Sequence, residues 1–140
     1  MIVLDTNLFA ELMRPSPEPK VFAWADRLDP AQVGITTMNE EEILQGIARL
    51  PVGRRREALQ HSWEALLPAL FGERIWAFTR EHAHWYGELL RQRELLGRPI
   101  ATADAVIAAT TLARGAQLAT RNGVDFAGIG IDLIDPWAQP

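Results

Sequence analysis

The first seven residues, Met1-Ile2-Val3-Leu4-Asp5-Thr6-Asn7, decide the fold that we expect for this chain. Residues 2–4 form a short, wholly apolar run with β-branched members, which is typical of a strand buried on both faces. The run ends at a carboxylate, Asp5, and Thr6, a common helix-capping residue type, begins an apolar helical pattern. Because open α/β sheets bind ligands at the carboxyl ends of their strands, Asp5 is a candidate functional acid. A role in starting the helix would explain it equally well.

Short apolar runs alternate with helical patterns along the rest of the chain. We expect further strands at residues 33–36, 117–120 and 131–134, and an edge strand at residues 75–78. We expect helices at residues 6–13, 19–28, 39–50, 54–67, 79–96 and 103–113. This alternation predicts one α/β domain over residues 1–140, with a largely parallel sheet of four to five strands and helices on both faces.

Length and composition fit a single folded domain. The chain has 140 residues, and 48% of them are hydrophobic, which is enough for a sizeable core. The absence of cysteine excludes disulfides, thiolate metal sites and cysteine nucleophiles. No apolar run approaches the roughly 18 residues that a membrane span needs. No charged segment precedes the first apolar run, as it would in a signal peptide. We therefore expect a cytoplasmic protein that does not enter a membrane.

The charged residues carry a weak signal about partners. The formal net charge of −4 argues against a broadly basic surface that binds nucleic acid, although a local nucleic-acid site is still allowed. Of the 14 basic residues, all but Lys20 are arginine. The base composition of the gene explains this bias most simply, and the suitability of arginine for phosphate binding is the functional alternative.

Four acids stand out by their positions in the expected elements. Asp5 ends the first strand, and Asp125 follows a later one. Glu42 and Asp104 lie in the first turns of two helices. Each of the last three also has a structural explanation. Glu42 can complete a capping box with Asn39, Asp104 can favour a helix dipole, and Asp125 can be a solvated loop acid.

Together, the positions of these acids predict a metal site. Acids that follow several strands of one parallel sheet converge at its carboxyl edge. Carboxylates that meet there repel one another unless a cation joins them. Mg²⁺ and Mn²⁺ prefer oxygen ligands, and Mg²⁺ combines a few protein carboxylates with waters and phosphate oxygens. Such a site can hold one or two ions for the in-line attack of water on a phosphodiester.

Motifs of other enzyme classes are weak or missing. The sequence has no G-x-G-x-x-G, no G-K-[ST] phosphate loop and no G-x-S-x-G elbow. His82 and His84 are two residues apart, so they point in different directions on a helix and make a poor zinc pair.

Motifs of one known family run in order along almost the whole chain. They are Ile2-Val3-Leu4-Asp5-Thr6-Asn7, Glu42-Ile43-Leu44-Gln45-Gly46, the run from Ile100 to Thr110, Ala119-Thr120-Arg121-Asn122, Asp125-Phe126 and Asp135-Pro136-Trp137. The first three are similar to that family's D-T-N, E-L-x-x-G and A-x-D-x-x-I-A-A-T. Through them the chain resembles PIN-domain proteins of the VapC and FitB type, the toxin half of toxin–antitoxin pairs.

The resemblance implies a PIN-like fold and a ribonuclease that depends on Mg²⁺ or Mn²⁺. It selects Glu42 over Glu40 and Glu41, because Glu42 has the right spacing from the glycine of the E-L-x-x-G motif. It places Asp5 and Asp104 as the innermost metal ligands, with Glu42 and a fourth position beside them.

The fourth position is where the chain departs from the pattern. Some relatives carry an acid directly after the T-R pair, where this chain has Asn122. The nearest acid is Asp125. Either Asp125 supplies the charge, or the site works with three acids and an amide.

The resemblance also implies partners. They are an RNA substrate, a second copy of the chain in a homodimer, and a cognate antitoxin, a small DNA-binding protein whose tail blocks the cleft. Candidate contacts to RNA phosphates are Arg121, Arg114 and the cluster Arg54–Arg56.

Two alternatives remain open from the sequence. A phosphoryl-transfer domain could use Asp5 as a nucleophile, but such enzymes carry D-x-D where this chain has Asp5-Thr6-Asn7. Receiver domains need a lysine near their acids, and the only lysine here is Lys20, near a proline-rich turn. The chain could instead be a non-catalytic binding partner with a PIN-like fold. The intact acids weigh against this, and an assay decides it.

Overall fold

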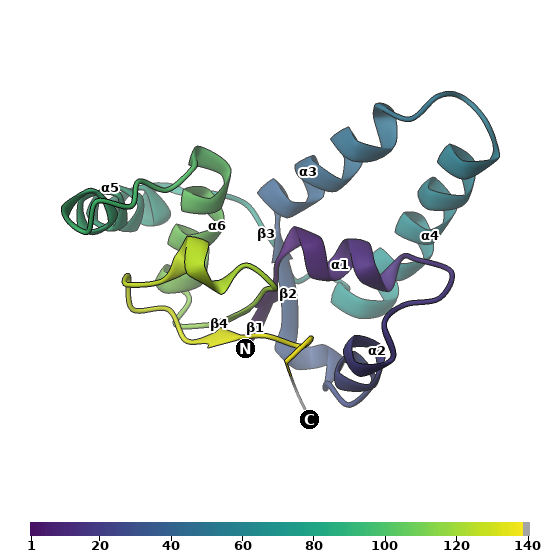
Figure 1. The fold of residues 1–140 in the computed structure, drawn as a ribbon, viewed down its shortest axis with the longest axis horizontal. Helices are drawn as coiled ribbons and strands as arrows, with labels where there is room; N and C mark the ends of the chain where they lie inside the picture. The colour runs from purple at the N-terminus through teal and green to yellow at the C-terminus, as the bar shows by residue number, and fades with distance from the viewer. Residues whose placement is uncertain (139–140) are drawn as a thin grey trace.

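The computed structural model describes residues 1–138 and shows a five-stranded parallel sheet with helices on both faces (Figure 1). The strands are β1 (Ile2–Leu4), β2 (Val33–Thr36), β3 (Ile75–Trp76), β4 (Gln117–Ala119) and β5 (Leu133–Ile134). The α-helices are α1 (Thr6–Leu12), α2 (Pro19–Asp26), α3 (Thr37–Ala48), α4 (Arg54–Phe71), α5 (Arg80–Leu95) and α6 (Thr102–Ala113). Two 3₁₀ turns are η1 (Pro30–Gln32) and η2 (Gly123–Phe126). The predicted α/β fold with a parallel sheet is confirmed.

Strand β1 lies at the centre of the sheet, in the order β3-β2-β1-β4-β5. It pairs with β2 and β4 in parallel, so that Val3 lies opposite both Gly34 and Leu118. The chain builds outward from β1 through β2 to β3, then crosses to the other side for β4 and β5. The order of the strands therefore reverses at β1, and ligands of open α/β sheets bind at the carboxyl side of such a switch point.

The two faces of the sheet have separate hydrophobic cores because successive strand residues point to opposite sides. Leu4 packs into the core that α1 to α4 build on one face, and Val3 packs into the core of α5 and α6 on the other (Figure 1). Trp24 and Trp63 lie in the first core, and Trp76 lies in the second. Three of the five tryptophans are therefore buried.

Some predicted boundaries differ from those of the structure. Helix α4 continues past its predicted end to Phe71, with Pro68 inside its last turn. Helix α6 begins at Thr102, one residue before its predicted start, and its N-cap is Ala101. Within residues 1–138, no helix has the length and apolar character needed to cross a membrane.

Candidate active site

Asp5 occupies the carboxyl end of the central strand and also starts a helix. Its Oδ1 accepts a hydrogen bond from the backbone N–H of Thr6 at 2.8 Å, so Asp5 is the N-cap of α1. Its Oδ2 accepts a hydrogen bond from the Thr120 hydroxyl, just beyond β4, at 2.7 Å. The side chain is only 5% exposed. The structural role and the position expected of a functional acid therefore coincide in one residue.

Helix α3 begins three residues earlier than the capping pattern of Asn39 and Glu42 predicted. Thr36, the last residue of β2, is its N-cap. The Thr36 hydroxyl accepts from the Asn39 backbone N–H at 3.1 Å, and Asn39 Oδ1 accepts from the Thr36 N–H at 3.0 Å. The capping-box explanation of Glu42 is therefore wrong, because the strand turns directly into the helix and Asn39 takes the position given to Glu42.

Glu42 is instead tied to the loop that carries Asp5. The Thr6 hydroxyl donates a hydrogen bond to Glu42 Oε1 at 2.7 Å. The same hydroxyl accepts from Asn39 Nδ2 at 3.0 Å, and this amide also reaches Asp5 Oδ1 at 3.5 Å. Asn39 is completely buried. Its amide therefore helps to fix Asp5 directly and Glu42 through the Thr6 hydroxyl. We did not predict this role from the sequence, although the T-x-x-N pattern directly after a strand was the available signal.

Asp104 faces the other three acids from the first turn of α6. Burial raises the pKa of Asp104 to about 6, and the negative charges of Asp5, Asp125 and Glu42 add to that rise. Asp104 thus lies within electrostatic range of the other three predicted acids. Asp125 lies on η2 and is exposed to solvent.

Asp5 is also shifted, for a mixture of opposing reasons. Burial raises the pKa of Asp5 above its ordinary value, and the charge of Asp125 acts in the same direction. The hydrogen bonds from Thr120, the Thr6 N–H and Asn39 favour the ionised form and limit the rise. A cation placed among these carboxylates would relieve the repulsion that both shifts report.

Arg93 is a buried cation on α5 that the sequence analysis missed. Its Nε donates to the carbonyl oxygen of Arg98 at 2.7 Å, and its Nη1 donates to those of Ala127 at 2.7 Å and Val124 at 3.2 Å. The guanidinium therefore fastens the segment that carries Asp125 to α5. Its positive charge opposes the rise in the pKa of Asp104. An arginine on a polar helix gives no sequence signal of such a role.

The donor set fits a hydrated divalent cation better than a closed protein cage. Within residues 1–138, no three Asp, Glu, His or Cys side chains form a group that could hold a metal ion by themselves. Mg²⁺ usually keeps several waters and uses one or two carboxylates together with substrate phosphates. The neighbouring carboxylates supply oxygen donors, and their mutual repulsion favours the binding of a cation between them. The residues present therefore fit such an ion.

One predicted basic contact lies far from these acids. The guanidinium of Arg114 lies over the ring of Trp76, 4.0 Å from its centroid. Ten helical residues separate Arg114 from Asp104, which corresponds to about 15 Å along the axis. Arg114 therefore belongs to the opposite end of α6.

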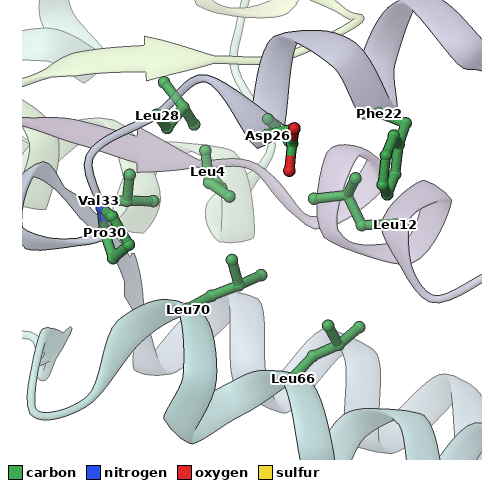
Figure 2. Close-up of a pocket in the computed structure, with 10 residues that line it drawn as sticks. Leu4, Leu12, Phe22, Asp26, Leu28, Pro30, Val33, Leu66 and Leu70 are labelled. Carbon is green, nitrogen blue, oxygen red and sulfur yellow. The ribbon is translucent and has the colours of Figure 1, made fainter.

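An apolar cavity of about 240 Å³ lies under the sheet on the side of α1, α2 and α4. Figure 2 shows Leu4 of β1 facing Leu66 and Leu70 of α4 across it. Asp26 is its one acidic lining residue, and none of the four site acids lines it. The cavity is thus separate from the acidic site.

Comparison with known proteins gives consistent similarities over the whole chain. The family model described as PIN domain matches residues 2–131. The chain is 38% identical over 138 residues to the VapC ribonuclease Y4jK of Sinorhizobium fredii, covering 98% of each chain. It is 33% identical over 137 residues to the toxin FitB of Neisseria gonorrhoeae, covering 98% of this chain and 99% of FitB. The structure of FitAB bound to an IR36 DNA fragment superposes with a TM-score of 0.92 at 32% identity, covering 100% of this chain and 98% of that one.

Proposed function

The chain belongs to the PIN-domain family, and on that premise we propose that it is a metal-dependent endoribonuclease, the toxin of a toxin–antitoxin pair. The observation that carries the proposal is the convergence of acids at the carboxyl edge of the sheet, where burial and the charges of Asp5, Asp125 and Glu42 raise the pKa of Asp104 to about 6. The similarity to a VapC ribonuclease and to the toxin FitB supports the same activity.

Asp5 and Asp104 would hold Mg²⁺ or Mn²⁺, with Glu42 and Asp125 beside them. When bound, the ion neutralises the carboxylates and stabilises the charge that develops on the phosphate during in-line attack by water. Thr120 and the Thr6 N–H keep Asp5 in one orientation through two short hydrogen bonds. A preorganised carboxylate needs no rearrangement when the substrate arrives, which favours the transition state.

Glu42 would position the attacking water and take its proton. The Thr6 hydroxyl donates a hydrogen bond to Glu42 Oε1, and the Asn39 amide donates a hydrogen bond to that hydroxyl in turn. Within residues 1–138, no hydrogen-bond donor is bound to Glu42 Oε2, so this oxygen is available to a water molecule. A general base must lie within hydrogen-bond reach of the proton that it removes.

Asp125 is our choice for the fourth position. Its charge acts on both Asp5 and Asp104. The contact of Asn122 with the site runs through its backbone N–H, which donates to the Thr120 hydroxyl at 3.1 Å. Asp125→Asn should therefore reduce cleavage more than Asn122→Ala, and the opposite order would indicate a site of three acids and an amide.

The proposed partners follow from the family. We expect a DNA-binding antitoxin, because the similar FitAB structure was solved with a DNA fragment. We also expect a homodimer and a single PIN-like domain. Light scattering of the purified chain at micromolar concentration tests the dimer, and a stable monomer would contradict it.

The alternative in which Asp5 is a nucleophile gains nothing from the geometry. The position of the second acid in D-x-D is taken by Asn7, whose Nδ2 donates to Asp5 Oδ2 at 3.5 Å. A non-catalytic partner would leave RNA intact under all conditions, so the same assay separates it from an enzyme.

The test is cleavage of a mixed-sequence RNA by the purified chain. We expect cleavage with Mg²⁺ or Mn²⁺, loss of cleavage with EDTA, and recovery when the metal is restored. Sequencing the new RNA ends identifies the cleavage site. Cleavage that resists the chelator, or an Asp5→Asn variant with full activity, would defeat the proposed mechanism.

A further inference from the structure

A groove adjoins the acidic site on the side of α1, α3 and α4. Its volume is about 500 Å³, which is within the usual range for ligand pockets. Thr6, Asn7 and Glu42 form the end that borders the acids. The groove is therefore continuous with the place where we expect the scissile phosphate.

Arginine side chains line this groove on two sides. Arg55 comes from the first turn of α4, and Arg121 follows β4. Arg14 also lines it, but its guanidinium is paired with Glu11 at 2.8 Å. Arg55 and Arg121 have no such ion pair within residues 1–138. Two unpaired guanidinium groups beside a nuclease site are suited to phosphate oxygens.

Trp137 holds one of these arginines in place. The guanidinium carbon of Arg121 lies 5.1 Å from the centroid of the Trp137 ring. The backbone N–H of Trp137 donates to Asp135 Oδ1 at 2.9 Å, which fixes the turn that presents the ring. A cation over an aromatic face loses side-chain freedom before a ligand arrives, so less freedom is lost on binding.

From these contacts we infer that the groove binds the single-stranded RNA on one side of the cleavage site, with Arg55 and Arg121 binding its phosphates and Trp137 positioning Arg121. This inference rests on the proposed function and adds the path of the strand. It also divides the arginine cluster 54–56, because Arg55 lines the groove whereas Arg56 lines a different hollow beside His61. Arg54 is exposed and lines neither.

The experiment measures the binding of a fluorescein-labelled, mixed-sequence RNA oligonucleotide by anisotropy, in EDTA and over a range of salt concentrations. Each phosphate contact to a single strand contributes a slope of about −0.7 to the plot of log affinity against log salt. Arg55→Ala and Arg121→Ala should each weaken binding and make this slope less steep by about 0.7. Arg54→Ala is the matched control on the same helix and should leave both quantities unchanged.

The role of Trp137 needs variants that separate its ring from its packing. Trp137→Phe keeps an aromatic face and should bind RNA nearly as well as the parent chain. Trp137→Leu keeps apolar bulk without a ring and should weaken binding about as much as Arg121→Ala. In the Arg121→Ala background, Trp137→Leu should cause no further loss, because the ring acts through Arg121. An equal loss in both backgrounds would assign Trp137 to packing and overturn its positioning role.

The outcomes separate this inference from the nuclease proposal. RNA binding that depends on Arg55 and Arg121, in a chain that never cleaves, would support the groove and defeat the proposed function. Cleavage with binding that Arg55→Ala and Arg54→Ala affect equally would overturn the groove and keep the nuclease. If both groove variants bind RNA normally but lose a co-expressed antitoxin, the groove belongs to the protein partner and the inference fails.

Discussion

The two halves of the acidic site are held in different ways. Asp5 and Glu42 accept short hydrogen bonds from Thr120 and Thr6, and buried Asn39 supports both. In the part of the chain that the structure describes, the carboxylates of Asp104 and Asp125 accept no hydrogen bond. Their positions come from the start of α6 and from the segment that Arg93 holds.

The half with Asp5 and Glu42 is preorganised by hydrogen bonds, whereas the half with Asp104 and Asp125 is under electrostatic strain. The hydrogen-bonded half keeps its geometry without a ligand, because every buried polar atom there has a partner. In the other half, burial and the repulsion of neighbouring carboxylates raise the pKa of Asp104, and no hydrogen bond offsets them. A bound cation should therefore relieve more repulsion at Asp104 than in the hydrogen-bonded half, and substitutions in the two halves should have different effects.

The largest expected effect is on activity, and both halves should show it. Asp5→Asn and Asp104→Asn should each lower RNA cleavage by about 10²–10³-fold, the scale seen when one electrostatic group is removed from an active site. Rates at saturating Mn²⁺ measure this. Glu41→Gln, on the exposed side of α3, is the control and should cleave normally. An active Asp104→Asn variant would confine catalysis to the hydrogen-bonded half.

The next effect is on stability, in the hydrogen-bonded half alone. Asn39→Ala removes half of the capping box of α3 and leaves the Thr6 hydroxyl without its buried donor. We expect a loss of about 2–3 kcal/mol in the free energy of unfolding, measured with urea. The exposed Asn122 is the matched residue, and Asn122→Ala should stay within about 0.5 kcal/mol of the parent chain. Equal losses would show that the network does not stabilise this edge.

Glu42→Gln should have a smaller effect that falls on activity and not on folding. Gln keeps an oxygen that accepts from the Thr6 hydroxyl, so the hydrogen bond survives. It loses the charge and the ability to take a proton, so we expect cleavage to fall by about 10–100-fold, as for residues that support a metal site. Thermal unfolding of the same variant should be unchanged. A rate equal to that of the Glu41→Gln variant would exclude Glu42 from catalysis.

The smallest predicted effect is a gain in stability in the strained half. In EDTA at pH 7, Asp104 is ionised in both the folded and the unfolded chain, and its raised folded pKa of about 6 means that ionisation disfavours folding. The contribution of this group to stability is full below pH 4 and is lost as the pH rises through 6. Asp104→Asn should therefore raise the melting temperature of the metal-free chain by a few degrees at pH 7.

The gain should vanish near pH 4, where Asp104 is protonated and resembles Asn, and added Mn²⁺ should reverse it. Scanning calorimetry at both pH values measures it. A variant that melts at the parent temperature at pH 7 would mean that the strain is already relieved without metal.

The sequence predicted the strands well because a run buried on both faces, such as residues 2–4, has one simple pattern. The proximity of Asp104 to the other three acids also followed from chain order, because the acids come after strands or at helix starts, and their role as a metal site stays a prediction. The start of α3 was missed because Asn39 and Thr36 can both cap a helix, and only the end of β2 decides between them. The roles of Thr36 and Asn39 could therefore be assigned only once the position of β2 in the sheet was known.

The supporting residues were harder to predict for the same reason. Arg93 binds carbonyl groups about 30 residues away, and its partners have no side-chain identity that a motif could carry. Asn39 reaches Asp5 and Thr6 only because β1 and β2 are adjacent. The division of the arginines among the groove, a second hollow and the far end of α6 likewise depends on tertiary packing.

The short strands at the two edges of the sheet have a consequence for assembly. β3 and β5 pair through only two residues each, so neither edge offers a long row of free peptide groups. Long flat edges are templates on which other chains add strands, and they lead to aggregation. We therefore expect a second copy or a protein partner to dock through side chains on helices and loops. If the chain assembles as we propose, its short edge strands should keep the sheet from extending from one copy to the next.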